Sequence, residues 1–356
     1  MSEFKKIGVW QTAFLGDAVL TLPLITALKE RYPEAEIHFF VRKGFGELFS
    51  AQPEIAEVHE FDKRGEQKTL GDARRYGKQI RKMGLDLWIS THASFRSAAV
   101  ARATGIKKRI GYKSPWYNRL AYHKVVDRRF DELEEIERLH QLLLPLGIEP
   151  PAPEPKVVLP ELAKGVAEAV LAMQPKDVPI VGLHPGSTWP TKCWPIEYYA
   201  VIARAAASAG CGVMIFAGPG EEEASAKVRQ LAGRGVHSLR ITDMGGKLKL
   251  PELAAVIGRL DAYVTNDSGP MHLAWMQKTP TLAMFGPTVR KLGFFPRGDH
   301  SVVLESELEC RPCGLHGHET CPEKHHKCMT EITPQMAWDA LIAMLGLDRR
   351  EQGADS

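Results

Sequence analysis

Three loops of this 356-residue chain combine residue types that could carry out a group transfer from a phosphorylated donor. In the first loop, Asp17 follows Gly16 between a short apolar strand and a helix. A carboxylate in this place can act as a general base that takes a proton from an acceptor hydroxyl. It can also be only a helix cap, a position that Asp favours. The residues alone leave both interpretations of Asp17 open.

The second loop, His-Pro-Gly-Ser-Thr-Trp-Pro-Thr-Lys-Cys-Trp-Pro at positions 184–195, again joins a strand to a helix. Its backbone N–H groups, the hydroxyls of Ser187 and Thr188, and the helix dipole could hold a phosphate. Lys192 adds a positive charge that would offset the charge growing on a departing diphosphate. The loop lacks the GxxxxGK[ST] pattern of a P-loop. The alternative is an aromatic packing loop with Lys192 in solvent.

The third loop, residues 265–272, has the same strand-to-helix position. Asp267, Ser268 and Gly269 predict a tight turn whose N–H groups face a ligand, and His272 lies one turn into the helix. Pro270 suits a first helical turn, where its missing N–H would be unpaired anyway. Asp267 could be only a cap, but two phosphate-type loops on one sheet favour binding.

A fourth feature is a cysteine-rich segment, residues 310–328, with four interleaved histidines. Its cysteines are Cys310, Cys313, Cys321 and Cys328. Four cysteines so close together suggest a structural zinc site. The spacing is not the paired CxxC arrangement of a zinc ribbon, so free thiols in a surface loop, a disulfide or another metal stay open.

The elements that must position these loops alternate as in a doubly wound parallel sheet. In the first half we expect strands at 7–10, 37–41 and 85–90 and helices at 18–31 and 97–103. In the second half we expect strands at 179–183, 212–216, 262–265 and 281–285 and helices at 196–209, 221–232, 251–259 and 271–276. Between the halves, the prolines of residues 147–160 forbid helix and favour an extended connector.

This pattern predicts an N-terminal domain over 1–150, a Pro-rich linker over 151–160 and a C-terminal domain over 161–356 that includes the cysteine-rich segment. Length supports two domains. We expect both domains to be Rossmann-like, with parallel sheets facing across a ligand-binding cleft.

Charge and composition limit the kinds of partner that the protein can be expected to bind. A net charge of +3 hides an asymmetry, because residues 60–130 hold 18 Lys or Arg against 6 Asp or Glu. Such a region can face nucleic acid or an acidic membrane glycolipid, or be only a solvated surface. No apolar run is long enough to span a bilayer, and the N-terminus lacks a secretory signal, so we expect a cytoplasmic protein.

Together the loops resemble glycosyltransferase family 9, the ADP-heptose:lipopolysaccharide heptosyltransferases, and most closely its heptosyltransferase II branch. The resemblance covers most of the chain. The matching stretches are GDAVLTLPLITALKERYP at 16–33, SFRSA at 94–98, RIGYKS at 109–114, HPGSTWPTKCWP at 184–195, VTNDSGPMHLA at 264–274, FGPT at 285–288 and ITPQ at 332–335. The cysteine-rich segment and the tail after Asp348 lie outside it.

The resemblance implies a GT-B fold and an inverting transfer of L-glycero-D-manno-heptose from ADP-heptose to the inner core of lipopolysaccharide in Gram-negative bacteria. In this family pattern Asp17 matches the catalytic base and Lys192 the phosphate-binding lysine. The remaining donor-binding positions correspond to Ser187, Thr188, Glu221, Leu248, Asp267, Ser268, Gly269 and His272. Glu221 matches the acid near the ribose, and Leu248 a side chain beside adenine.

The acceptor, lipid A carrying Kdo and heptose, is anionic, so Arg96, Arg119 and Arg138 are candidate contacts. Reaching it requires at least transient contact with the cytoplasmic face of the inner membrane. The scheme requires no metal, although Mg²⁺ could stimulate it and the cysteines could hold structural zinc. Rival interpretations are a GT-B transferase with another nucleotide sugar and a non-catalytic glycolipid- or nucleic-acid-binding protein. Nucleic acid is the less favoured partner, because the chain lacks a recognisable nucleic-acid motif.

Overall fold

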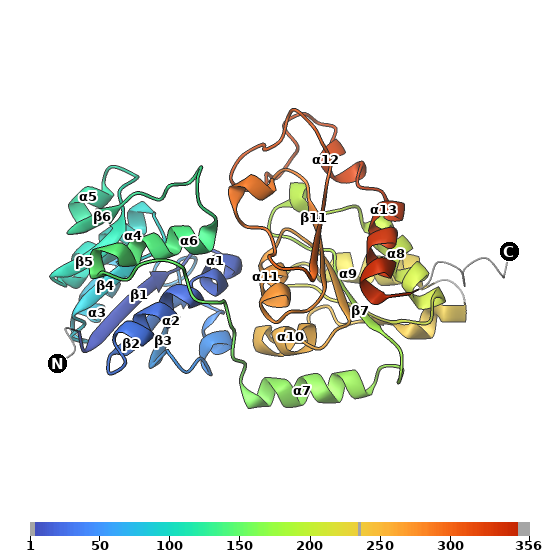
Figure 1. Ribbon diagram of the computed structural model, residues 1–356, viewed down its shortest axis with the longest axis horizontal. Coiled ribbons are helices and arrows are strands. Elements are labelled where there is room, and N and C mark those ends of the chain that lie inside the picture. Colours follow the sequence, from blue (N-terminus) through green and yellow to red (C-terminus); the bar gives the residue numbers. More distant parts are fainter. Residues whose placement is uncertain (1–3, 234–235, 348–356) are drawn as a thin grey trace. The chain divides into compact units, whose positions relative to one another are not determined.

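The computed structural model describes residues 4–233 and 236–347. The chain divides into two compact units, residues 1–160 and 161–356, which Figure 1 shows in the blue-to-green and green-to-red parts of the chain. The tail that we set apart after Asp348, and Asp348 itself, lie outside the described residues.

Within its described residues, the first unit contains a six-stranded parallel sheet. Its strands are β1 (Lys6–Gln11), β2 (Glu36–Arg42), β3 (Glu57–Phe61), β4 (Leu87–Ser90), β5 (Lys108–Tyr112) and β6 (Lys124–Val126). They lie in the order β3-β2-β1-β4-β5-β6. The strands that we expected at 7–10, 37–41 and 85–90 correspond to β1, β2 and β4.

Helices join these strands. They are α1 (Leu15–Leu20), α2 (Leu22–Arg31), α3 (Leu70–Arg81), α4 (Phe95–Thr104), α5 (Asn118–Ala121) and α6 (Glu135–His140), with 3₁₀ turns η1 (Gly46–Phe49) and η2 (Gln141–Leu146). Helix α3 packs against α4, and α2 against α6. An aromatic core that includes Trp10, Phe40 and Trp88 lies beneath α3 and α4.

The single helix expected over 18–31 is wrong in one respect, because two helices meet at Thr21. The physical reason is Pro23, in the first turn of α2, which has no N–H to donate to the preceding turn. The first helix also begins earlier, at Leu15, which places Asp17 inside its first turn.

The second unit repeats this topology within its described residues. Its strands are β7 (Ile180–His184), β8 (Gly212–Ile215), β9 (Ile241–Asp243), β10 (Ala262–Asn266), β11 (Thr281–Phe285) and β12 (Ser301–Glu305). They are all parallel and lie in the order β12-β11-β10-β7-β8-β9. Both sheets therefore have the doubly wound order 3-2-1-4-5-6 when strands are counted within each unit.

The helices of the second unit are α7 (Glu161–Ala172), α8 (Ile196–Ser208), α9 (Glu222–Ala232), α10 (Leu250–Ile257), α11 (Gly269–Met276), α12 (Lys327–Thr330) and α13 (Pro334–Leu345), with 3₁₀ turns η3 (Pro190–Lys192), η4 (Val236–Arg240) and η5 (Arg290–Leu292). Helix α8 packs between α9 and α13, and α10 packs against α7 and α11, as Figure 1 shows. In the described part of the chain, no helix is long and apolar enough to cross a membrane.

The proline-rich stretch is not a free connector. The Gln52 side chain donates to the Lys156 carbonyl at 3.3 Å and accepts from the Val158 N–H at 2.9 Å. Val157 and Leu159 are buried. Residues 151–160 therefore belong to the first unit, and the second unit begins with α7.

The repeated strand order fixes where each unit can bind a ligand. In such sheets the connections reverse direction at a switch point, and ligands bind outside the carboxyl ends of the two strands that meet there. In the first unit these strands are β1 and β4, and in the second they are β7 and β10. The three chemistry-bearing loops of the sequence start at the ends of β1, β7 and β10.

Candidate active site

In the second unit, the loops after β7 and β10 meet through Lys192 and Asp267. The Lys192 ammonium donates to the Asp267 carboxylate at 2.6 Å, and the Thr288 hydroxyl donates to the same oxygen at 2.6 Å. All three residues are buried. Burial alone would raise the pKa of Asp267, but the Lys192 charge and the two hydrogen bonds lower it below its usual value. A cation thus lies at the switch point, where a diphosphate could bind.

Asn266, the last residue of β10, ties the two loops together. Its amide nitrogen donates to the carbonyls of Pro185 and Gly186 at 2.8 and 3.2 Å. Its amide oxygen accepts from the Trp194 N–H at 3.0 Å and the Tyr199 hydroxyl at 3.1 Å. Because Asn266 is fully buried, these four bonds satisfy the whole side chain without water.

Glu221 immediately precedes α9 and turns back toward the loop after β7. Its carboxylate accepts from the His184 ring at 3.3 Å and from the Gly218 N–H at 3.1 Å. Burial raises the pKa of Glu221, but the bond and charge of His184 outweigh it, so the net shift is downward. Tyr263 fixes the other His184 nitrogen at 2.8 Å. A Cβ at Gly186 would collide with the Glu221 carboxylate, which would have to move away from its bonds with His184 and Gly218.

His272 and Ser268 occupy the first turn of α11 and its N-cap. The Trp275 indole donates to Nδ1 of His272 at 3.2 Å, so the proton of the neutral ring is on Nε2. Burial is the main cause that lowers the pKa of His272, to about 4. Ser268 lies 3.3 Å from the Thr265 hydroxyl, and Gly269 begins the helix. At neutral pH His272 is thus a neutral donor beside the N-terminus of α11.

The remaining predicted donor contacts are less enclosed. Ser187 is half-buried and Thr188 is exposed, both in the loop after β7. Leu248 is half-buried in the segment before α10. All three side chains are therefore accessible to a ligand.

The cysteine-rich segment packs on the phosphate-type loop through Thr191. The Thr191 hydroxyl donates to the His318 carbonyl at 2.9 Å and accepts from the His318 N–H at 2.7 Å. The His326 ring donates to the Thr191 carbonyl at 2.8 Å. The segment therefore supports the residue next to Lys192, which sequence reasoning did not foresee.

The four clustered cysteines are free thiols in the structure, as are Cys193 and Cys211. Burial, and after it the neighbouring Cys313, raises the pKa of Cys328 to about 11. Burial and the charge of Cys310 also raise the pKa of Cys313. The thiols thus share one neighbourhood. In residues 4–233 and 236–347, however, one group of three possible metal ligands has its donor atoms within 4.8 Å of one another. That group does not include these cysteines.

Asp17 lies at the carboxyl end of the first sheet. Its carboxylate accepts from the Phe14 N–H at 3.1 Å, so Asp17 is not the N-cap itself but the third residue of α1, which bonds back to the N-cap Phe14. Desolvation raises the pKa of Asp17, while that bond and the charges of Arg128 and Lys63 oppose the rise. Arg128 in turn donates to both oxygens of the buried Glu135 at 2.7 and 2.8 Å. The carboxylate is therefore desolvated and lies beside a fixed cation.

A pocket of about 320 Å³ opens at the switch point of the first unit. It is lined by Trp10, Thr12, Phe61, Lys63, Leu70, His92, Ser94, Phe95, Arg96 and Ser97. The Lys63 ammonium donates to the Thr12 carbonyl at 2.7 Å, and burial, followed by nearby arginines, lowers its pKa to about 8. Arg96 donates to the Lys63 carbonyl at 3.0 Å. The pocket thus presents cations within a partly aromatic wall.

The three arginines predicted to contact the acceptor lie in different environments. Arg96 lines the pocket, and Arg119 is exposed on α5 outside the pocket lining. Arg138 must be corrected: its side chain is fully buried, donates to Glu135 and to the Phe130 carbonyl, and stacks on the Phe130 ring at 4.0 Å. A guanidinium held in this way supports Glu135, so we no longer regard Arg138 as an acceptor contact.

Several site residues carried no role in the sequence analysis. Asn266 and Thr288 lie within the motifs VTNDSGPMHLA and FGPT, so their presence in those motifs was the available signal. Lys63, His92 and Arg128 lie in no quoted motif. They come together only through the parallel register of the first sheet.

Comparisons with known proteins identify the family of this chain. The model of glycosyltransferase family 9 (heptosyltransferase) matches residues 73–326. Lipooligosaccharide heptosyltransferase 2 of Campylobacter jejuni is 25% identical over 93% of this chain and 95% of its own length. Lipopolysaccharide heptosyltransferase 2 of Escherichia coli K12 is 27% identical over 96% of this chain and 98% of its own length.

Solved structures confirm the fold. The structure of E. coli ADP-heptose LPS heptosyltransferase II aligns with a TM-score of 0.78 at 24% identity, over 96% of this chain and 98% of that one. An E. coli heptosyltransferase with ADP-2-deoxy-2-fluoro heptose aligns with a TM-score of 0.71 at 19% identity, over 95% and 99%. The predicted GT-B fold is therefore confirmed. The match over most of the chain shows that this protein is a glycosyltransferase and belongs to glycosyltransferase family 9, the heptosyltransferase family.

Proposed function

We propose that the enzyme transfers L-glycero-D-manno-heptose from ADP-heptose to the inner core of lipopolysaccharide. The family match supports this, as do the names of the two heptosyltransferase relatives. The bound ADP-heptose analogue in the E. coli structure of the same fold supports an ADP-linked donor.

The observation that carries the proposal is the arrangement of the second unit at the ends of β7 and β10. Lys192, the α11 N-terminus and His272 gather where a doubly wound sheet binds its ligand. We assign the diphosphate to Lys192, Ser187, Thr188 and the turn Asp267–Gly269, the ribose to Glu221 and the adenine to the side of Leu248. Backbone N–H groups and a lysine together suit a diphosphate because both favour negative charge.

In the proposed reaction Asp17 removes the proton from the acceptor hydroxyl as its oxygen attacks C1 of the heptose. The new C1–O bond forms while the bond from C1 to the β-phosphate oxygen breaks, and ADP leaves with inversion at C1. Desolvation makes the Asp17 carboxylate a stronger base than one in water, and Arg128 helps to keep it ionised at neutral pH.

Lys192 and the helix N-terminus stabilise the charge that develops on ADP. With these groups in place the proposed chemistry requires no divalent cation, although Mg²⁺ can stimulate it by screening the diphosphate. On the acceptor side, the pocket of the first unit offers Lys63 and Arg96 to an anionic inner-core sugar. The proposal therefore divides the substrates between the units, with the donor on the second and the acceptor on the first.

We also propose that the first unit touches the membrane that carries the acceptor. Phe95, Trp116 and Leu120 are 52%, 74% and 66% exposed, and Phe95 contacts Tyr117, the neighbour of Trp116. Arg119 is exposed beside them. Aromatic and basic side chains together suit the interface of an anionic bilayer. Trp116→Ser with Leu120→Ser should reduce binding to anionic vesicles, whereas Leu239→Ser, an exposed position of the second unit, should not.

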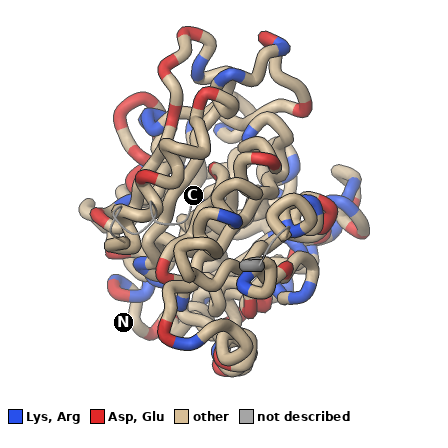
Figure 2. The backbone as a smooth tube through the Cα atoms, turned by 90° about the vertical axis from the view of Figure 1, so that its right-hand side faces the viewer, with Lys and Arg blue, Asp and Glu red and all other residues tan. Residues whose placement is uncertain are grey.

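A nucleic-acid-binding role finds less support. In the second unit, which faces the viewer in Figure 2, Lys and Arg are interspersed with Asp and Glu. Such a partner would require a continuous basic surface along the backbone of the nucleic acid.

Thermal unfolding with ADP, UDP, GDP or CMP tests the donor. A ligand at about 100 times its dissociation constant stabilises a protein by roughly 2.7 kcal/mol. We expect ADP to raise the melting temperature more than the others, and transfer from ADP-heptose to be lost in Asp17→Asn. Preference for UDP or GDP would assign a different sugar donor, and no response to any nucleotide would contradict the proposal.

A further inference from the structure

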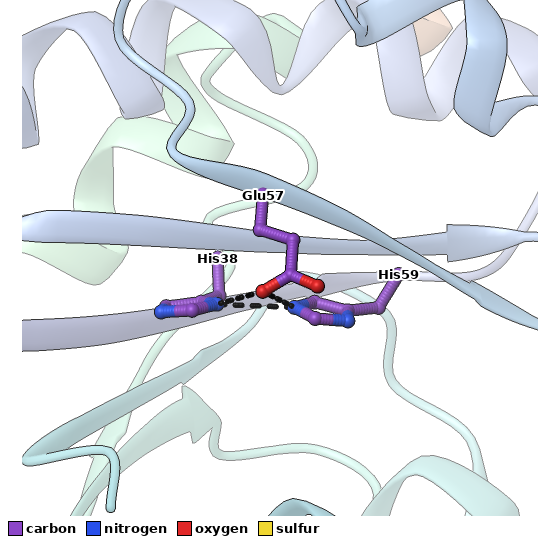
Figure 3. Close-up of side chains that lie close together, drawn as sticks. All are labelled: His38, Glu57 and His59. Atoms are coloured by element: carbon purple, nitrogen blue, oxygen red, sulfur yellow. Dashed lines mark hydrogen bonds and ion pairs between the residues drawn. The ribbon is translucent and has the colours of Figure 1, made fainter. Parts of the chain in front are cut away.

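The first unit contains a group of possible metal ligands away from the proposed catalytic residues. His38 lies on β2, and Glu57 and His59 lie on the edge strand β3. Parallel pairing places His38 opposite Glu57 and Phe40 opposite His59, so these side chains share one face of the sheet. Figure 3 shows the Glu57 carboxylate between the two imidazole rings.

The distances within this group fit a tetrahedral ion. Nδ1 of His38 lies 3.0 Å from Nε2 of His59, and each nitrogen lies 3.6 Å from Oε2 of Glu57. In a tetrahedral zinc site with bonds of about 2.0–2.2 Å, two ligand atoms lie about 3.3–3.6 Å apart. Small side-chain rotations would therefore place one ion at equal distance from all three atoms.

The environment favours the metal-binding form of His38. Nε2 of His38 is buried without a hydrogen-bond partner and lies 3.8 Å from the Glu36 carboxylate. Histidines that bind a metal through one nitrogen usually donate the other N–H to a carboxylate, which fixes the tautomer. Glu36 is in place for that role, and Lys6 holds Glu36 at 3.1 Å.

Both rings are also suited to coordination by their charge state. Burial is the main cause that lowers the pKa of His38 and of His59. Neutral imidazole is the form that binds metal. In the present contact one facing nitrogen donates to the other. His59, whose ring stacks on Phe40 at 4.6 Å, needs only to move its proton to Nδ1 to offer a second lone pair.

We propose that His38, Glu57 and His59 bind one zinc-class divalent cation. The side chains of His38 and His59 are 7% and 16% exposed, whereas that of Glu57 is 61% exposed, so the ion enters from the Glu57 side. Water completes the coordination there. The ion would join the edge strand β3 to β2.

This site has a structural link to the acceptor pocket. Strand β3 ends at Phe61, and Phe61 and Lys63 line the pocket. An ion at the beginning of β3 would thus fix the strand that carries Phe61 and leads to Lys63. The inference does not depend on the proposed donor or acceptor, because its test measures metal binding and not transfer.

The test titrates Zn²⁺ into the chelator-stripped full-length protein by calorimetry. The cysteine-rich segment could also take up metal, so the protein carries Cys313→Ser and Cys321→Ser throughout. We expect one equivalent to bind, and Co²⁺ in its place to give visible d–d bands without a thiolate charge-transfer band. His59→Asn should abolish this binding, and His123→Asn, at an exposed histidine of the same unit, should not change it.

A second variant covers the case in which His59→Asn fails to fold. Glu57→Gln changes an exposed side chain and should weaken Zn²⁺ binding at least about tenfold, and Glu36→Gln should weaken it about tenfold as well. Zn²⁺ should raise the melting temperature of the parent protein but not of Glu57→Gln. Absence of Zn²⁺ binding in the parent protein would overturn the proposal. So would Zn²⁺ binding in both Glu57→Gln and His59→Asn that is as strong as in the parent.

Discussion

The Lys192 ammonium and the Asp267 carboxylate form a buried ion pair of 2.6 Å that joins the loops after β7 and β10 of the second unit. Asp267 thus neutralises the cation that is proposed to hold the diphosphate. A bound diphosphate would share Lys192 with Asp267, so stability and donor binding depend on the same pair.

Substitutions of Lys192 and Asp267 should separate the effect on stability from the effect on nucleotide binding. Lys192→Met leaves a buried carboxylate uncompensated and should destabilise the second unit by about 3–5 kcal/mol, besides weakening ADP binding. Adding Asp267→Asn should restore most of the stability but not the affinity for ADP. Calorimetric unfolding and ADP titration of both variants check this; recovery of ADP binding in the double variant would show that Lys192 does not hold the phosphates.

Asp17 should govern the acidic limb of the pH–rate profile. Asp17→Asn should lower kcat at least about 100-fold with ADP affinity unchanged. As the proposed base, Asp17 must be ionised for transfer, so a higher pKa of Asp17 moves this limb to higher pH. Arg128 lowers that pKa, so Arg128→Gln should shift the limb upward.

A substitution of the neighbouring Glu135 should shift the acidic limb of the pH–rate profile in the opposite direction. Its negative charge and that of Asp17 repel each other, so Glu135→Gln should shift the limb downward. Thermal unfolding at each pH separates these shifts from loss of fold. Shifts in the same direction for both variants would argue against Asp17 as the titrating base.

His272 should make the stability of the second unit dependent on pH. Its pKa is about 4 in the folded protein, against about 6.5 for an unfolded chain, so the unfolded state binds the proton first as pH falls. The contribution of the neutral His272 ring to the free energy of unfolding is complete above pH 6.5. It is lost as the pH falls toward 4, and the loss is about 3 kcal/mol at most. Asp267 and Lys192 are the charges that act on the ring.

The comparison is with His272→Gln, which cannot take up this proton. The melting temperature of the parent protein should fall more steeply than that of the variant between pH 6.5 and pH 4. Parallel curves would mean that His272 titrates normally.

Arg96 should affect acceptor use more than donor binding. Charge reversal in Arg96→Glu removes a cation from the pocket and should lower kcat/KM for the acceptor about 10- to 100-fold, the range of a charged hydrogen bond. ADP affinity should stay unchanged. Arg102→Glu, at an exposed position on the same helix, is the matched control. An equal loss in both variants would point to general electrostatics.

Asn266 should be intolerant of a near-isosteric change. Asn266→Asp replaces a double donor with an oxygen that faces the carbonyls of Pro185 and Gly186, and should cost about 3 kcal/mol of stability. Gln230→Glu makes the same chemical change at an exposed position and should be nearly neutral. Denaturant unfolding of the two variants measures the difference.

Apolar, regular elements could be predicted from the sequence, and polar or short ones could not. Strand β11 was predicted with its observed bounds because Thr281–Phe285 is compact and largely apolar. Strand β3 was missed because Glu57, His59 and Glu60 make it look like a loop. It is a strand because its partner β2 satisfies its backbone, which no local pattern reveals.

The same limit applies to the sites. Loops at the ends of strands were foreseeable, since they follow from strand–helix alternation and carry recognisable residue types. The burial of Arg138 was not, because it depends on Glu135 and Phe130 folding around it. The contact of His38 with Glu57 and His59 likewise depends on the register of two strands about 20 residues apart in sequence.

The hydrogen bonds of Asn266 also bear on the rate at which a nucleotide binds. Because its four hydrogen bonds are all made within the chain, they hold both loops without a contribution from a ligand, so little backbone order remains to be gained when a nucleotide binds. Association should then be as fast as diffusion and orientation allow, with no slower phase from loop folding. Differences in affinity among nucleotides would appear in how long each one stays bound.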